Sequence, residues 1–192
     1  KASEASSALF VRGKTLLAVY VDDLLASGPS AELASFWKEL GQEFEFKPDS
    51  DGDALPEFHG AKPCTEFLGI KFEDLSTSSE SRWSLSLGDY IRDTVKEYEK
   101  LWGTVVTPSR TPGVGCIRSP EPAALRKPSV RERPVHDLQV IVGRLLWIAR
   151  TTHPEISHMA SSFGSRIVTW DAECDRELAR TMGFLALAAD SG

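Results

Sequence analysis

The 192-residue sequence lacks several features that mark common protein classes. It contains no apolar run long enough to cross a bilayer and no basic-then-apolar leader. Its three cysteines, Cys64, Cys116 and Cys174, are odd in number and widely spaced, which suits reduced thiols better than a disulfide framework. Internal repeats and cysteine pairs with zinc-site spacing are also absent. These absences disfavour membrane-spanning, disulfide-framed and zinc-finger proteins, and they predict an intracellular protein.

The sequence also lacks the positive charge that usually marks a nucleic-acid-binding protein. Its net charge is −6. Residues 1–100 hold 11 basic and 19 acidic side chains, whereas residues 101–192 hold 11 basic and 9 acidic ones. Within 126–150, six basic residues outnumber two acidic ones. This basic segment could contact phosphates, although a solvated loop is the commoner explanation.

The Pro-, Gly- and Asp-rich segment 48–63 resembles the start of a calcium-binding loop. Asp49, Asp51 and Asp53 stand at alternate positions, as calcium ligands would. However, the sixth position is Ala54 where such a loop needs glycine, and the twelfth is Gly60 where it needs glutamate. The segment is therefore interpreted as an acidic loop insertion.

The most informative feature present is a pair of adjacent acids, Asp22 and Asp23. They stand between two apolar runs, Leu16–Tyr20 and Leu24–Ala26, which predict two short antiparallel strands with the acids at the exposed turn. Two carboxylates about 5 Å apart repel by roughly 3 kcal/mol at an effective dielectric near 20. Because a turn needs only one Asp to bond its own backbone, the second acid indicates a bound cation. The alternative is a solvated Asp-Asp turn.

Periodicity and turn residues predict the other elements. Ser30 is expected to cap a helix over 30–44 whose apolar side, including Trp37 and Leu40, packs on the sheet. Strands near 64–73 and 82–87 should form a second hairpin with Ser76 to Ser81 at its tip. A helix over 88–102 and a Pro-rich irregular segment over 103–134 should follow. Three further helices are expected near 135–150, 154–168 and 171–189, the last capped by Asp171. One apolar cluster is expected to contain Leu145, Leu146, Ile148, Phe163, Phe184 and Leu187.

Five segments, in order, resemble one protein family. Tyr20-Val21-Asp22-Asp23 resembles the polymerase motif of reverse transcriptases, in the spelling of copia-type LTR retrotransposons. The later segments are Phe67–Phe72, similar to the family's primer-grip FLGI segment; Val142–Ala149, similar to VGSLLYLA; Thr151–Ile156, similar to T-R-P-D-I; and Met182–Ala186, similar to an RYLKG-like helix. Each match alone is weak, but the ordered set is specific and covers nearly the whole chain.

The resemblance implies an α+β fold: the C-terminal half of a polymerase palm, built of antiparallel hairpins and a packing helix, followed by a helical thumb or connection region. Residues 1–87 would form the partial palm, 88–134 a thumb-like helix and Pro-rich linker, and 135–192 a C-terminal helical region. The sequence holds neither the earlier Asp-bearing strand and fingers nor an RNase H domain. It is therefore expected to be a fragment of a longer polyprotein.

The resemblance also implies RNA-directed DNA polymerase chemistry with two Mg²⁺ ions, or Mn²⁺ in their place. Asp22 would be the principal metal ligand and Asp23 a supporting one. Nucleic-acid contacts would come from Tyr20 and Val21 beneath the primer terminus and from Phe67, Leu68, Gly69 and Ile70 along the primer backbone. Lys47 is a candidate general acid for the leaving pyrophosphate.

The partners implied are an RNA or DNA template with its primer duplex, deoxynucleoside triphosphates, and the N-terminal polymerase half and RNase H domain of the parent polyprotein. The implied location is a cytoplasmic retrotransposon particle with access to the nucleus. Without the third carboxylate, the isolated chain is expected to be inactive. Two alternatives stay open: a nucleic-acid-binding remnant without catalysis, and an unrelated α+β interaction domain.

Overall fold

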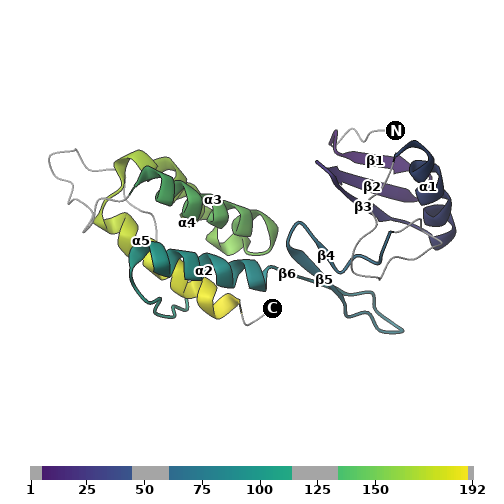
Figure 1. Cartoon of the computed structure of the whole chain (residues 1–192). Coiled ribbons are helices and arrows are strands. Elements are labelled where there is room, and N and C mark those ends of the chain that lie inside the picture. The colour runs from purple at the N-terminus through teal and green to yellow at the C-terminus, as the bar shows by residue number, and fades with distance from the viewer. Residues whose placement is uncertain (1–5, 45–60, 114–133, 190–192) are drawn as a thin grey trace. The chain divides into compact units, whose positions relative to one another are not determined.

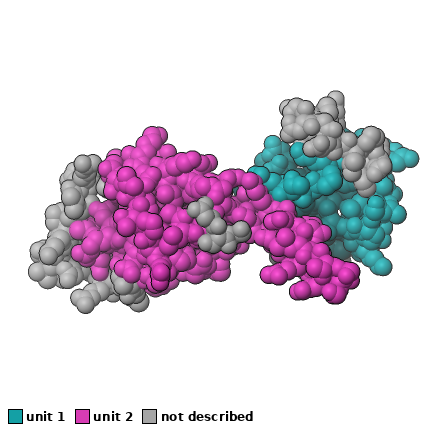
Figure 2. Space-filling model, turned by 90° about the horizontal axis from the view of Figure 1, so that it is seen from below, with its two compact units in different colours: residues 1–67 teal, residues 68–192 magenta. Residues whose placement is uncertain are grey.

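A computed structural model describes residues 6–44, 61–113 and 134–189 of the chain (Figure 1). Within these ranges the fold is α+β, with two three-stranded sheets and five α-helices. The chain divides into two compact units, residues 1–67 and residues 68–192 (Figure 2). Among the described helices, none is both long and apolar enough to cross a membrane.

The first unit contains an antiparallel sheet of three strands in sequence order: β1 (Leu9–Arg12), β2 (Thr15–Tyr20) and β3 (Asp23–Ser27). Leu17 lies opposite Ala26 and Tyr20 opposite Asp23. The predicted antiparallel pairing of Leu16–Tyr20 with Leu24–Ala26 is therefore confirmed. The strand that precedes them, β1, extends the sheet on the other side of β2.

Helix α1 (Ser30–Glu43) confirms the predicted helix and lies against one face of this sheet (Figure 1). Arg12 and Thr15 are cross-strand partners, so their side chains share that face. The Arg12 guanidinium binds the Glu39 carboxylate at 2.6 and 2.9 Å, and the Thr15 hydroxyl donates to Glu32 at 3.3 Å. These polar contacts tie the helix to the β1–β2 end of the sheet.

Two details of α1 differ from the sequence-based expectation. Pro29 occupies the N-cap position without a side-chain hydrogen bond, and Ser30 is already helical. The prediction that Ser30 caps the helix is wrong, because the fixed φ of proline already prepares the chain for helix entry. Trp37 and Leu40 are half-buried rather than buried, and no residue of α1 is fully enclosed.

The second sheet has the order β4 (Glu66–Phe67), β5 (Ile70–Asp74) and β6 (Trp83–Ser86). Strands β5 and β6 pair antiparallel, and hydrogen bonds between Thr77 and Glu80 close their polar tip, as predicted. The strand expected over 64–73 is not continuous. It is interrupted by a turn at Leu68-Gly69, where both residues have positive φ.

Four α-helices complete the second unit: α2 (Gly88–Trp102), α3 (Val135–Thr151), α4 (Ser157–Arg166) and α5 (Ala172–Ala188). Short 3-10 turns, Pro154–Ile156 and Ile167–Thr169, flank α4. All four predicted helices are confirmed. Asp171 is the N-cap of α5, as predicted, since its carboxylate accepts hydrogen bonds from the backbone N–H groups of Glu173 and Cys174.

The hydrophobic core lies among these four helices, which we call the helical cluster. Its fully buried large side chains are Leu87, Ile91, Tyr98, Leu138, Ile141, Leu145, Ile148, Ile156, Phe163, Leu178, Met182 and Leu185. Leu145, Ile148 and Phe163 were predicted correctly, and Phe184 packs at the edge of the core. The prediction is wrong for Leu146 and Leu187, which are 41% and 43% exposed.

Several expectations fall outside the described residues. They concern Lys47, the acidic segment with Asp49, Asp51 and Asp53, Cys116, and most of the Pro-rich segment 103–134. The described portion of that segment, residues 103–113, packs against α5 closely enough that a Cβ on Gly183 would lie 2.2 Å from the Thr107 carbonyl oxygen.

Candidate functional site

The acidic turn is a two-residue connection between β2 and β3. Tyr20 pairs with Asp23, so Val21 and Asp22 are the two central residues. The expectation that both acids lie in the turn is therefore wrong for Asp23, which is the first residue of β3. Val21 has φ +57°, whereas no positive φ occurs at Asp22. A positive φ at the first central position alone is the pattern of a type II′ turn, where glycine is the usual residue. A β-branched side chain in this conformation stores strain of about 1–3 kcal/mol.

The side chains of this turn are open to solvent. Tyr20 is 54% and Val21 is 86% exposed, and both Asp22 and Asp23 are exposed. Alternation along the strands places Tyr20 and Asp23 on the sheet face opposite to Arg12 and Thr15, away from α1. The turn therefore presents two adjacent carboxylates and an aromatic ring at an accessible end of the sheet.

Two carboxylates at an exposed tip fit a divalent cation that also binds a phosphate, because Mg²⁺ uses few protein ligands and retains other oxygen ligands. They do not form a complete protein cage. In the described parts of the chain, no group of three His, Cys, Asp or Glu side chains could hold a metal ion. Asp22 and Asp23 thus offer part of a ligand set.

The second predicted site also lies at a turn. Phe67 ends β4, Leu68 and Gly69 form a two-residue loop, and Ile70 begins β5. Leu68 has φ +54° and Gly69 has φ +78°, the pattern of a type I′ turn. A Cβ on Gly69 would meet nothing within 4 Å. Glycine is therefore needed for its backbone conformation, and the open space beside it leaves the backbone accessible.

The structure groups the predicted site residues into two separate turns. Tyr20, Val21, Asp22 and Asp23 share one turn in the first unit. Phe67 to Ile70 form the other, which contains the division between the units. The last candidate, Lys47, lies outside the described residues.

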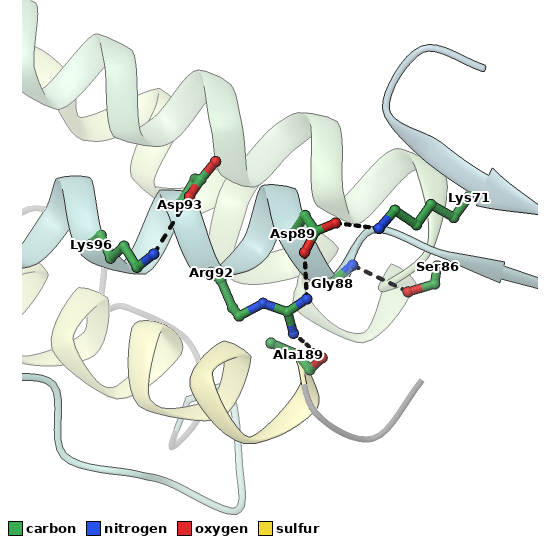
Figure 3. Close-up of polar contacts among 8 residues, drawn as sticks. All are labelled: Lys71, Ser86, Gly88, Asp89, Arg92, Asp93, Lys96 and Ala189. Carbon is green, nitrogen blue, oxygen red and sulfur yellow. Dashed lines mark hydrogen bonds and ion pairs between the residues drawn. The ribbon is translucent and has the colours of Figure 1, made fainter. Parts of the chain in front are cut away.

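Sequence reasoning missed a polar cluster beside the second turn (Figure 3). Asp89, in the first turn of α2, accepts hydrogen bonds from Lys71 of β5 and from Arg92. Arg92 also donates to the carbonyl oxygen of Ala189 at 3.1 Å. The hydrogen bonds from Lys71 and Arg92 lower the pKa of Asp89 to about 2. Lys71 is a polar residue at a regular position of the apolar–polar alternation of β5, so no signal in the sequence singled out this cluster.

Comparison with known proteins relates the chain to a transposon protein. The sequence is 31% identical over 150 residues to a transposon Ty5-1 protein of Saccharomyces cerevisiae, a match that covers 78% of this chain and 41% of that protein. The chain thus spans less than half the length of this relative. No family model matches the sequence, and no solved structure matches it. The relationship supports a retrotransposon origin for the chain.

Proposed function

We propose, from this retrotransposon relationship and from the acidic turn, that the chain is the later part of a copia-type reverse transcriptase polymerase domain. The observation that carries the proposal is the position of Asp22 and Asp23, exposed at the tip of a hairpin whose other face is covered by α1. A solvated turn would not need a second acid, nor a strained valine beside it.

The chemistry proposed is template-directed nucleotidyl transfer. Bound Mg²⁺, or Mn²⁺ in its place, supplies electrostatic stabilisation of the attacking and leaving oxygens. Asp22 is the principal ligand, because it occupies the centre of the turn, and Asp23 supports it from the first position of β3. Tyr20, on the same face as Asp23, lies where a primer terminus approaching these carboxylates would pass.

The second turn has a proposed role in primer binding. Phe67 to Ile70 hold the primer backbone, with Gly69 leaving room for a phosphate.

The remaining proposed roles concern the leaving group and the partners. Lys47 is the proposed proton donor to pyrophosphate. The partners are a primer–template duplex and deoxynucleoside triphosphates. The third carboxylate and the nucleotide-binding fingers would come from polypeptide outside these 192 residues, and the proposed location is a cytoplasmic retrotransposon particle.

The test is single-nucleotide incorporation by a longer protein in which the upstream polymerase sequence is restored. We expect the 192-residue chain alone to show no extension and the longer protein to extend a DNA primer on an RNA template when Mg²⁺ is present. Asp22→Asn should abolish extension, since it removes a metal-binding charge without changing shape. Asp23→Asn should impair it by a similar or smaller factor.

Asp93→Asn provides the matched control, because Asp93 is an exposed carboxylate on α2 and should be replaceable without loss of activity. Equal extension rates for the longer protein and its Asp22→Asn variant would show that the acidic turn has no catalytic role. A longer protein that binds primer–template duplex but never extends it would instead indicate a nucleic-acid-binding remnant.

A further inference from the structure

The β5–β6 hairpin is attached to the helical cluster on one of its faces by apolar side chains. Ile70, the first residue of β5, packs against the hydrophobic core. Leu87, which links β6 to α2, is 2% exposed and belongs to that core. The base of the hairpin is therefore held by burial, and it lies directly after the Leu68-Gly69 turn.

A polar network attaches the other face. Lys71 follows Ile70 in the strand, so its side chain points to the opposite face. It binds Asp89, whose second carboxylate oxygen accepts a hydrogen bond from Arg92 at 2.5 Å. Arg92 continues to the Ala189 carbonyl at the end of α5 (Figure 3). The network thus joins β5, the start of α2 and the end of α5.

Attachment on both faces restrains the orientation of the β5–β6 hairpin more than attachment on one face does. Apolar packing of Ile70 alone allows a strand to roll about its axis, since dispersion contacts have little directionality. A charge-assisted hydrogen bond from Lys71 has a preferred direction and opposes this roll. Ser86, the cross-strand partner of Lys71, adds a further restraint, because its hydroxyl accepts the Gly88 N–H at 3.2 Å.

We propose that Asp89 and Lys71 are a positioning pair that sets the orientation of the Leu68-Gly69 turn on the helical cluster. If the turn holds the primer backbone, as the proposed function has it, this pair also aligns that backbone. The pair is half-exposed, and exposed ion pairs add little to global stability. Its removal should therefore act on the local order of the hairpin rather than on unfolding of the whole unit.

Amide hydrogen exchange of the 192-residue chain tests the pair without any catalysis. Lys71→Met and Asp89→Asn should each speed exchange over 68–74 by about three- to fivefold, and the double variant should add little more. Asp93→Asn removes the same charge one helical turn away, where Asp93 lies 3.9 Å from Lys96, and should leave this exchange unchanged.

The Lys71 variant also separates positioning from helix capping, because Asp89 is the acidic residue in the first turn of α2. If Asp89→Asn speeds exchange and Lys71→Met does not, Asp89 serves only the helix and the proposed pair is overturned. Additive effects of the two substitutions would overturn it as well.

Primer kinetics in the longer protein test the alignment. Lys71→Met and Asp89→Asn should raise KM for primer–template about threefold or more with kcat little changed. Asp89→Glu, which keeps the carboxylate, should have a KM closer to that of the unsubstituted protein. Unchanged KM in an active longer protein overturns the inference and leaves the proposed function intact. A longer protein without activity overturns the proposed function, and the exchange measurement still decides whether the pair exists.

Discussion

At the scale of single residues, Val21 shows how the acidic turn departs from the simplest hairpin. Its φ of +57° suits glycine, and the 86% exposed side chain gains nothing from burial in return. The valine is nevertheless placed beside Asp22. Strain of this kind persists when the surrounding structure holds it, and it gathers at functional sites.

Replacing Val21 by glycine should therefore stabilise the chain. Relief of strain, partly offset by the greater entropy of an unfolded glycine, should raise the free energy of unfolding by roughly 1 kcal/mol. Urea denaturation of the 192-residue chain measures this change. Val19→Gly, inside β2, is the control and should destabilise. A lower unfolding midpoint for Val21→Gly would show that the turn carries no strain.

The adjacent leucines of α3 separate core from surface. Leu145 is fully buried, whereas Leu146 is 41% exposed because a residue of an α-helix points about 100° away from its neighbour. Leu145→Ala should lower the free energy of unfolding by about 2–5 kcal/mol, and Leu146→Ala by less than about 1 kcal/mol. Thermal or urea unfolding of the two variants makes the comparison, and equal losses would contradict the assigned helix face.

At the scale of elements, the helices and the polar tip of the β5–β6 hairpin were predictable from the sequence, whereas the turn at Leu68-Gly69 was not. Apolar spacing indicated all five helices, and Asp171 was recognisable as a cap because Asp favours that position. The Leu68-Gly69 turn was not recognisable. The run from Phe67 to Phe72 is apolar enough for one strand, and a leucine at φ +54° contradicts local preference. Gly69 was the only hint.

The ion pair that links β5 to α2 gives a pH-dependent prediction. Because the pKa of Asp89 is lowered from its ordinary value of 3.8 to about 2, the contribution of this carboxylate to the local order of the β5–β6 hairpin is present above pH 4. It should be lost as the pH falls from about 4 through 2. NMR titration of the side-chain carboxyl should show this low midpoint, and Lys71→Met should move it upward. A midpoint that Lys71→Met leaves unchanged would contradict the pairing.

Asp171 has two roles: it caps the N-terminus of α5, and it forms an ion pair with the buried Arg166. Burial opposes ionisation, yet hydrogen bonds from Cys174 and Glu173 and the nearby Arg166 lower its pKa. Arg166 is 5% exposed and ion-paired with Asp171. Asp171→Ala should lower the free energy of unfolding by about 2–5 kcal/mol, because it removes both the N-cap hydrogen bonds and the ion pair with Arg166. Asp171→Asn keeps the cap and should cost less. Calorimetric melting of both variants tests this order.

At the scale of the whole molecule, burial is divided unequally between the two units. Every fully buried hydrophobic side chain of the described residues lies between Leu87 and Ala189. In the first unit, Thr15 is the only fully buried residue that the structure describes. The sheet face turned away from α1 exposes Val11, Leu16 and Tyr20 at 46%, 41% and 54%.

Composition could not reveal this division. The 41% hydrophobic content indicates enough apolar residues for a core, but not where the core lies. The apolar runs beside Asp22 are as rich in leucine and valine as the buried helices, yet their side chains remain half-buried or exposed. Periodicity assigns a residue to one face of an element, whereas burial depends on what tertiary structure covers that face.

The two units should consequently differ in stability. The free energy from burial scales with the apolar area removed from water, at about 25 cal/mol per Å², and the first unit buries little. Native-state hydrogen exchange should show amides of β1 to β3 exchanging through openings of lower free energy than amides of α2 to α5. Val21→Gly should slow only the first group, and Leu145→Ala should speed only the second. Equal opening energies, or a response of both groups to either substitution, would mean that the chain unfolds as one cooperative body despite its unequal cores.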